Sequence, residues 1–323
     1  MNEPLVQARD LQIAFHTPDG VTNAVNGISF DLNAGDTLCI LGESGSGKSV
    51  TLRALMRLNP ARSTRMSGTL LLNGHDIIAA DEARMNNLRG GSVAMIFQEP
   101  MSAFDPVFTV GDQIAESVVR HQAVSWRTAR ARALELLELV QIPSAARRLD
   151  AYPHELSGGL RQRAMIAMAL ACRPKLLLAD EPTTALDATV QIQILLLLRK
   201  LQEELGMAII FVTHDLGVAS EISRRIAVMY AGRIVEQGDV KQVMSTPLHP
   251  YTQGLMGATV HPGLRGQRLT VIPGAPPPLH ALPPGCSFAP RCSQAVDTCH
   301  IAVPDMQVPA PGHMARCVHV STH

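Results

Sequence analysis

A glycine-rich octapeptide, GESGSGKS at residues 42–49, has the spacing of a polyphosphate-binding loop. Its glycines permit backbone angles that a β-carbon would forbid, so successive N–H groups can turn inward around an anion. Lys48 would reach the β- and γ-phosphates of a nucleotide, and the Ser49 hydroxyl would bind Mg²⁺. The sequence therefore predicts a nucleoside triphosphate site formed by Gly42, Ser44, Gly45, Ser46, Gly47, Lys48, Ser49 and Val50.

Two adjacent carboxylates, Asp180 and Glu181, end the apolar run KLLLADEP at residues 175–182. Neighbouring residues of a strand point to opposite faces, so these two acids cannot do the same job. Asp180 suits the Mg²⁺ shell shared with Ser49, while Glu181 is suited to polarising the water that attacks the γ-phosphate. By itself the pair is equally compatible with a solvated acidic turn. Together with the phosphate loop it predicts ATP hydrolysis.

An alternation of strand-like and helix-like segments must position these groups. Several strand-like runs are continuously apolar, which is typical of strands covered on both faces of an α/β sheet. The strand-like runs are 5–15, 28–32, 37–41, 70–72, 93–97, 176–179, 208–213, 226–230 and 233–236. The helix-like segments are 48–56, 127–140, 160–171, 190–205 and 218–223. We therefore expect an α/β fold.

Two regions depart from this alternation. Residues 100–172 lack strong strand signals, which predicts a helical insertion in the α/β body. After Gly238, prolines become frequent and are expected to break up regular structure; they are Pro247, Pro250, Pro262, Pro273, Pro276, Pro277 and Pro278. We expect a domain boundary near residue 240, with 241–323 as a small Pro- and Cys-rich extension.

Composition excludes some classes of function. The chain has 28 Lys and Arg residues against 28 Asp and Glu residues, so no charge bias points to nucleic acid or an acidic lipid surface. The N-terminal sequence MNEPLVQARD has no secretory signal pattern. The longest apolar run, 164–172, has nine residues, whereas a membrane span needs roughly 18 or more. We therefore expect a membrane role only through a partner.

Further motifs resemble those of one family. The segments LSGGLRQR at 156–163, ADEPTTALD at 179–187, Gln98 after MIF and His214 in FVTHD are similar to the nucleotide-binding subunits of ATP-binding cassette (ABC) transporters. The resemblance covers residues 5 to about 240. It implies a P-loop NTPase cassette with a mostly parallel core sheet, an antiparallel β subdomain and a helical subdomain at about 100–172.

The resemblance is greatest to the ATPase subunits of oligopeptide and dipeptide importers. The segments that carry it are FHTPDG, FQEPMSAFDP, YPHELSGG, MYAGRIVEQG, HPYTQGL and PPGCSFAPRC. Nickel importers are close relatives, and these motifs do not separate the two. Leu160 stands where many family members have Gln, but Met is common there in peptide importers, so an apolar residue does not indicate an inactive site.

The resemblance also implies roles for individual residues. Ser157, Gly158 and Gly159 lie at the start of a helix, chemically an anion site, and in the family they bind the γ-phosphate held by the opposing subunit. Two ATP molecules are thereby sandwiched between two subunits. The resemblance implies three further roles. Gln98 senses the metal and the attacking water, and His214 contacts the γ-phosphate. Asp187 communicates across the dimer.

Phe15 is a candidate for stacking on adenine, since an aromatic face suits a purine. Phe15 alternates with Leu11 and Ile13, so core packing explains it equally well. In the family, residues 99–108 contact the transmembrane subunits.

The function implied is that of a motor subunit of a bacterial di- or oligopeptide importer, with ATP and Mg²⁺ as cofactors. Its expected partners are a second, usually distinct ABC ATPase, two permease subunits and, indirectly, an extracytoplasmic binding protein, at the cytoplasmic face of the inner membrane. A soluble ABC ATPase of translation or DNA repair and a cassette without catalysis are the alternatives. Soluble ABC ATPases usually carry two cassettes or a long coiled-coil insertion, and neither appears in this sequence. A cassette without catalysis would have lost catalytic side chains, whereas Lys48, Asp180, Glu181 and His214 are all present.

Four of the six cysteines, Cys286, Cys292, Cys299 and Cys317, lie close to the C-terminus, whereas Cys39 and Cys172 lie in apolar runs and fit small core residues. In a cytosolic protein, metal ligation or unrelated thiols are more frequent than stable disulfides. Gaps of five, six and seventeen residues do not match the paired spacing of zinc ribbons. Resemblance to importer ATPases with a similar tail favours a 4Fe-4S cluster over zinc or unligated thiols.

Overall fold

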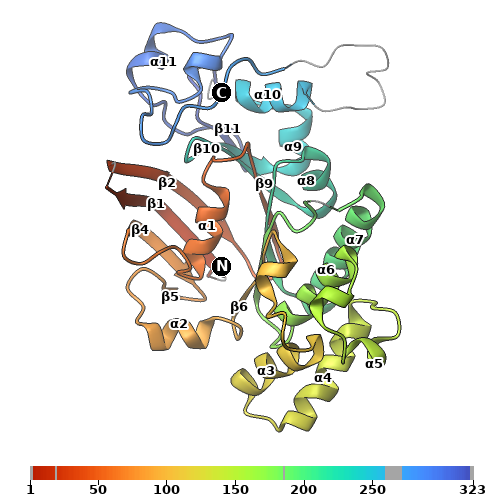
Figure 1. The fold of residues 1–323 in the computed structure, drawn as a ribbon. Coiled ribbons are helices and arrows are strands. Elements are labelled where there is room, and N and C mark those ends of the chain that lie inside the picture. The colour runs from red at the N-terminus through yellow and green to blue at the C-terminus, as the bar shows by residue number, and fades with distance from the viewer. Residues whose placement is uncertain (1–2, 19, 185, 259–270, 321–323) are drawn as a thin grey trace. The chain divides into compact units, whose positions relative to one another are not determined.

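The computed structural model describes residues 3–18, 20–184, 186–258 and 271–320. Asp19 of FHTPDG, Ala185 of ADEPTTALD and Pro262 lie outside the described residues. The chain forms two compact units (Figure 1). Unit 1 comprises Met1–Leu5, Asn33–Asp36 and Ala79–Phe211, and unit 2 comprises Val6–Leu32, Thr37–Ile78 and Val212–His323.

Unit 2 contains an antiparallel sheet with the strand order β2-β1-β4-β5. Strand β1 pairs with both β2 and β4, and its buried residues Val6, Ala8, Leu11 and Ile13 form one apolar face. The strands are β1 (Val6–Thr17), β2 (Gly20–Leu32), β4 (Thr64–Leu72) and β5 (His75–Asp76).

A second set of strands in unit 2 has the order β11-β12-β10-β9-β3. Strand β3 runs parallel to β9, whereas β10 is antiparallel to both β9 and β12. These strands are β3 (Thr37–Leu41), β9 (Arg225–Tyr230), β10 (Arg233–Asp239), β11 (Gln307–Ala310) and β12 (His313–Ala315). The helices are α1 (Lys48–Leu55), α8 (Leu216–Ile222), α9 (Val240–Ser245), α10 (Pro250–Gly257), the 3-10 helix η4 (Ala289–Arg291) and α11 (Asp297–Ile301).

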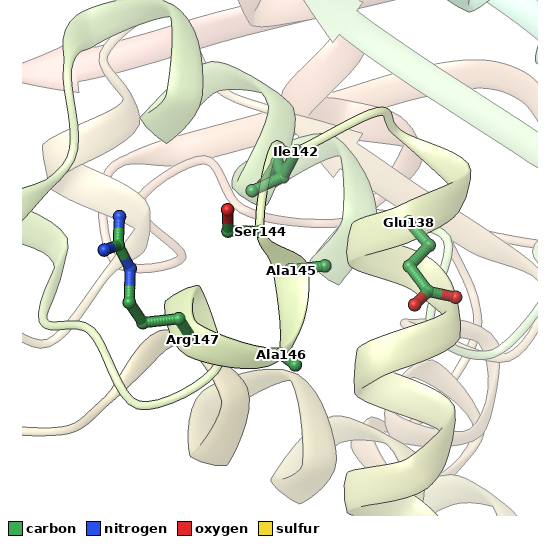
Figure 2. Close-up of a pocket in the computed structure, with 6 residues that line it drawn as sticks. All are labelled: Glu138, Ile142, Ser144, Ala145, Ala146 and Arg147. Carbon is green, nitrogen blue, oxygen red and sulfur yellow. The ribbon is translucent and has the colours of Figure 1, made fainter.

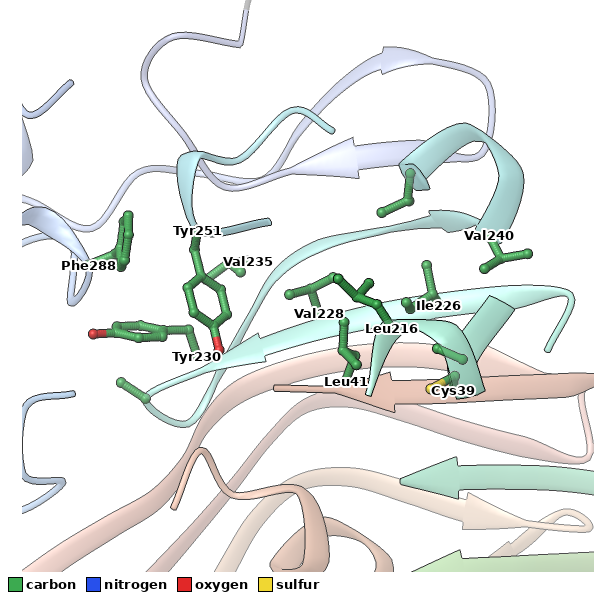
Figure 3. Close-up of a cluster of buried hydrophobic side chains, with 13 residues drawn as sticks. Cys39, Leu41, Leu216, Ile226, Val228, Tyr230, Val235, Val240, Tyr251 and Phe288 are labelled. Atoms are coloured by element: carbon green, nitrogen blue, oxygen red, sulfur yellow. The ribbon is translucent and has the colours of Figure 1, made fainter. Parts of the chain in front are cut away.

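The C-terminal part of the chain shares a hydrophobic core with β3 and β9. Buried side chains from β3 (Cys39, Leu41) lie in one cluster with Tyr251 of α10 and Phe288, as Figure 3 shows. Regular structure therefore continues beyond Gly238, contrary to the expectation from the prolines. Proline is compatible with a first helical turn, where its missing N–H has no intrahelical partner, and Pro250 begins α10 in this way.

Unit 1 has the strand order β8-β7-β6. Strands β6 and β7 are parallel, with Ile96 opposite Ala179, and both are fully buried. The strands are β6 (Val93–Ile96), β7 (Leu176–Asp180) and β8 (Ala208–Thr213), the last two residues of β8 belonging to unit 2. The helices are α2 (Glu82–Leu88), η1 (Pro100–Ala103), α3 (Val110–Gln122), α4 (Trp126–Leu139), α5 (Ala145–Arg148), η2 (Pro153–Glu155), α6 (Gly158–Ala169) and α7 (Ala188–Leu205).

Residues 97–175, all of them described, hold helices and no strand. Helix α3 packs on α4, and α4 contacts α5 and α6 (Figure 1). The hydroxyls of Thr109 and Ser125 cap α3 and α4 by accepting backbone N–H groups in each first turn. Arg130 of α4 forms ion pairs with Asp112 in the first turn of α3 and with Asp150 just after α5, which links these segments to α4.

Candidate functional site

The glycine-rich loop follows β3 directly and leads into α1, as the sequence predicts. A β-carbon on Gly42 would lie 2.2 Å from the carbonyl oxygen of Met229, and one on Gly47 would lie 2.3 Å from that of Ala24. Gly47 also has a φ of 99° and forms the N-cap of α1. Close approach of neighbouring backbone therefore requires glycine at both positions.

The loop is held by backbone hydrogen bonds to the β9–β10 turn. The Gly232 N–H donates to the Ser46 carbonyl over 3.0 Å, and the Asn26 N–H donates to the Gly232 carbonyl over 2.7 Å. Inside the loop, Lys48 Nζ donates to the carbonyl oxygens of Gly42 and Glu43 at 2.8 and 2.9 Å, with the residue 4% exposed. The ammonium group is thus held at the start of the loop.

Ser46 has a buried hydroxyl with no hydrogen-bond partner among the residues that the structure describes. Buried polar atoms are nearly always hydrogen-bonded, so an orphaned hydroxyl inside a glycine loop fits a ligand oxygen. Together with the buried ammonium of Lys48 and the N-terminus of α1, it makes this loop chemically suited to a polyphosphate.

The remaining candidates in unit 2 lie at strand β1 and at the end of β8. His214 directly follows β8 and is exposed, while the next residue, Asp215, caps α8 by accepting the N–H groups of Gly217 and Val218. Phe15 is half-buried on β1, beside the fully buried Ile13 and Leu11. A half-buried ring leaves one part for core packing and another for a ligand.

In unit 1 the acidic pair stands at the C-terminal end of β7. Asp180 is only 2% exposed, and Glu181 follows it with a φ of 46°, in the left-handed region. The Thr184 hydroxyl donates to Glu181 Oε2 over 3.0 Å. A non-glycine residue in this region is strained, and such strain is concentrated at functional positions.

Gln98 lies two residues beyond the end of β6, the parallel neighbour of β7. Because parallel strands end at the same edge of a sheet, the structure brings exposed Gln98 and the acidic pair to one edge of unit 1. Ligands of open α/β sheets bind at such an edge.

The two remaining motifs form helix N-termini in unit 1. Ser157 is the exposed N-cap of α6, but its side chain makes no capping hydrogen bond, and Gly158 and Gly159 form the first turn. Asp187 caps α7 by accepting the Val190 N–H over 2.9 Å. A β-carbon on Gly159 would lie 2.9 Å from Val190, so these two helices are closely packed there.

A hollow elsewhere in unit 1 contains none of the predicted site residues. It is open and lies between the end of α4 and α5, lined by Glu138, Ile142, Ser144, Ala145, Ala146 and Arg147 (Figure 2). The chemistry that the motifs predict is therefore not located in this hollow.

The comparisons with known proteins agree with these motifs. Residues 25–184 match the family described as ABC transporter, and residues 235–299 match the family described as the C-terminal region of oligopeptide/dipeptide transporters. The dipeptide transport ATP-binding protein DppD of Bacillus subtilis is 44% identical over 98% of this chain and 94% of its own length. The chain belongs to the ABC transporter family.

Other relatives support the same assignment. The oligopeptide transport ATP-binding protein OppD of Salmonella typhimurium is 47% identical over 97% of this chain and 93% of its own. Among solved structures, the dimeric ATP-binding cassette MJ0796 bound to ADP and phosphate superposes with a TM-score of 0.65, at 28% identity, over 73% of this chain and 98% of that one. The predicted ABC cassette fold is confirmed, and the protein is an ABC ATPase with ATP as its nucleotide.

Within the described residues, no helix of this ABC cassette is long and apolar enough to cross a bilayer.

The C-terminal cysteines are free thiols. Burial raises the pKa values of Cys286, Cys292 and Cys317, and the charge of the Cys299 thiolate would raise all three further. The Cys286 N–H donates to the Cys299 carbonyl over 2.7 Å, so these two residues are neighbours in space. Backbone N–H groups donate to the sulfur atoms; that of Gln294 donates to Cys292 Sγ over 3.4 Å. Over the described part of the chain, however, no three His, Cys, Asp or Glu side chains are grouped so that they could hold one metal ion.

One set of contacts at the loop was not predicted from the sequence. Arg291 and Tyr251, both beyond residue 240, contact Glu43 inside the glycine loop. Arg291 and Glu43 are separated by 248 positions in the sequence, so no local pattern could have revealed the pair.

Proposed function

We propose that this chain is the ATP-hydrolysing subunit of a bacterial importer for di- or oligopeptides. The observation that carries the proposal is the near full-length similarity to DppD and OppD, which extends beyond the cassette into the C-terminal region. The same C-terminal match, beginning at residue 235, supports a boundary near 240 between the cassette and an extension at 241–323. The helical subdomain would occupy about 100–172.

In this function the glycine loop binds the phosphates of ATP. The N–H groups of Gly42 and of residues 44–50, together with the Ser46 hydroxyl, would contact phosphate oxygens, and the Lys48 ammonium would neutralise the β- and γ-phosphates. Ser49 and Asp180 would ligate Mg²⁺, and Phe15 would stack on adenine. The orphaned Ser46 hydroxyl and the buried ammonium support these roles.

The hydrolytic step would use Glu181 to polarise the attacking water. Gln98 would orient that water and the metal, and His214 would contact the γ-phosphate. The strained backbone at Glu181 and the shared sheet edge with Gln98 support this assignment.

A second cassette would complete the site. Ser157, Gly158 and Gly159 at the start of α6 would bind the γ-phosphate held by the partner, and Asp187 would report on it across the interface. The exposed Ser157 hydroxyl, not used as a helix cap, supports this role, as does the dimeric state of MJ0796.

The partners would be a distinct second ABC ATPase, two permease subunits and, indirectly, an extracytoplasmic binding protein. The chain would then lie peripherally at the cytoplasmic face of the inner membrane. Recovering the full chain from membranes in mild detergent and identifying what comes with it tests this arrangement. Permeases and a second cassette are expected, whereas ribosomes or DNA would contradict it.

The transported solute separates the leading proposal from its closest alternative. Uptake of a labelled dipeptide and of ⁶³Ni²⁺ can be measured in cells with and without this chain. Loss of peptide uptake alone is expected. Loss of nickel uptake alone would assign the chain to a metal importer of the same subfamily.

A 4Fe-4S cluster at Cys286, Cys292, Cys299 and Cys317 is proposed on the chemistry of the thiols. The backbone contact between Cys286 and Cys299 and the N–H group that donates to Cys292 Sγ support thiolates held by iron. No ligand geometry in the described residues supports it. Anaerobically purified protein should contain iron and acid-labile sulfide; zinc or no metal would contradict the proposal.

A further inference from the structure

Glu43 places a carboxylate inside the loop that we propose binds the phosphates of ATP. It is the second residue of the loop, and its carbonyl oxygen accepts a hydrogen bond from Lys48 Nζ over 2.9 Å. Its side chain is 28% exposed, so solvent screens its charge only in part. An uncompensated negative charge at this position would oppose the binding of a polyphosphate.

Arg291, from the C-terminal part of the chain, neutralises this carboxylate. Its Nη1 donates to Glu43 Oε2 over 2.8 Å and its Nη2 donates to Oε1 over 3.2 Å, which is a bidentate pair. The arginine side chain is 6% exposed, so this pair is much better shielded than an ordinary surface ion pair.

The position of Arg291 is fixed by its surroundings. Nε donates to the Pro273 carbonyl over 2.8 Å, and Nη1 also donates to the Tyr230 hydroxyl over 3.3 Å. The guanidinium carbon lies 5.8 Å from the centre of the Tyr230 ring and 6.0 Å from that of Phe288. Two aromatic rings beside the cation and four hydrogen bonds from the guanidinium hold the fork in one orientation.

The backbone of Glu43 is held from the same part of the chain. Its N–H donates to the hydroxyl of Tyr251 over 3.0 Å, and Tyr251 is fully buried in α10. The ring centroids of Tyr251 and Tyr230 lie 4.6 Å apart, and Phe288 packs on both (Figure 3). Both the side chain and the peptide of Glu43 are therefore fixed by residues beyond 240.

We propose that Arg291 is a positioning residue for ATP binding, which holds Glu43 and cancels its charge so that the loop can accept a polyphosphate. Tyr251 supports the same end of the loop. The proposal rests on the proposed function, because the polyphosphate is the ligand on which Arg291 acts. It gives the C-terminal extension a direct part in nucleotide binding.

The test is the affinity of the full-length chain for a fluorescent ATP analogue with Mg²⁺. Arg291→Gln is expected to weaken binding about tenfold, because the carboxylate is left unpaired. Arg291→Gln combined with Glu43→Gln is expected to return to near wild-type affinity, because no carboxylate then needs neutralising. Arg291→Lys, which keeps the charge without the bidentate fork, is expected to lie in between.

Two controls make the result specific. Arg9→Gln removes another Arg–carboxylate pair of unit 2, with Asp31 at 2.6 Å, outside the loop, and is expected to leave affinity unchanged. Glu43→Gln alone preserves the shape of the loop and keeps Arg291 cationic, so it is expected to bind at least as tightly as wild type. Thermal unfolding without nucleotide identifies any variant that fails to fold.

Wild-type affinity in Arg291→Gln would overturn the inference, as would a double variant that binds as weakly as the single one. A tenfold loss of ATP-analogue affinity in Glu43→Gln alone would overturn it too. If Arg291→Gln does not fold, the affinity of Glu43→Gln is the deciding measurement. Failure of the wild-type chain to bind the analogue would instead contradict the proposed function.

Discussion

At the scale of single residues, the phosphate loop depends on positions where no side chain fits. Gly47 combines a φ of 99° with a neighbouring carbonyl oxygen 2.3 Å from the place of a β-carbon. Gly74, in the turn between β4 and β5, has a similar φ of 76° but nothing within 4 Å of that place. A substitution at Gly74 therefore introduces backbone strain alone, whereas a substitution at Gly47 introduces both strain and a steric clash.

We predict that Gly47→Ala lowers the free energy of unfolding by about 1–3 kcal/mol more than Gly74→Ala, whose cost is the left-handed strain alone, about 1–2 kcal/mol. Urea denaturation of the nucleotide-free protein measures both. Equal decreases in the free energy of unfolding of the two variants would mean that the loop can move away from the Ala24 carbonyl.

At the scale of secondary-structure elements, the N-terminus of α10 is fixed by a buried polar group. Glu236 of β10 is fully buried and accepts the N–H groups of Leu248 and His249, each over 2.9 Å, and it contacts His313 Nε2 at 2.8 Å. The His249 Nδ1 in turn accepts the Tyr251 N–H over 3.0 Å. These bonds orient the helix that carries Tyr251.

Acid is expected to destabilise this junction. Burial lowers the pKa of His249 from 6.5 to about 3, so unfolding takes up a proton at any pH between these values. Stability should therefore fall as the pH drops below about 6.5, by up to about 1.4 kcal/mol per pH unit from this residue. Asn can cap the helix without titrating. The melting temperature of His249→Asn should therefore fall less than that of wild type between pH 7 and pH 4.5, as measured by thermal denaturation. Identical pH profiles would exclude His249 as the source.

Strands surrounded by apolar neighbours were the easiest elements to predict. Residues 37–41 and 208–213 are continuously apolar runs between turn residues, and β3 and β8 have those bounds. Helix α3 was not predicted as a separate helix, although Thr109 with Asp112 three residues later is a capping signal and Val110, Ile114 and Val118 repeat at helical spacing. The C-terminal strands β11 and β12 are short; β12 pairs with β10 and β11 pairs with β12, and no local sequence pattern encodes the pairing with β10.

Long-range contacts were equally impossible to predict at the candidate site. Motifs whose chemistry is local, such as the glycine loop and the acidic pair, could be read from the sequence. The pairing of Arg291 with Glu43 arises from tertiary structure, because it joins segments far apart in the sequence, and the left-handed φ of Glu181 has no counterpart in a sequence pattern.

At the scale of the whole molecule, a second subunit completes the proposed ATP site. Ser157 is exposed at the start of α6 and, in our proposal, acts on the ATP of the partner. Ser157→Glu should repel that γ-phosphate and abolish turnover at the partner's site, while ATP binding by this chain's own loop stays at wild-type affinity. Titration of the isolated chain and turnover of the assembled complex give the two readouts. Loss of binding in the isolated chain would contradict a role in trans.

In the proposed function, this chain hydrolyses ATP with Glu181 inside a transport complex. The most direct test is ATP turnover of the complex recovered from membranes, comparing wild type with Glu181→Gln. We predict that turnover falls at least about twofold, with the remainder arising at the partner's own site, because loss of such a group slows its step by about 10²- to 10⁴-fold. ATP binding to the variant should persist. Unchanged turnover in Glu181→Gln would contradict the account.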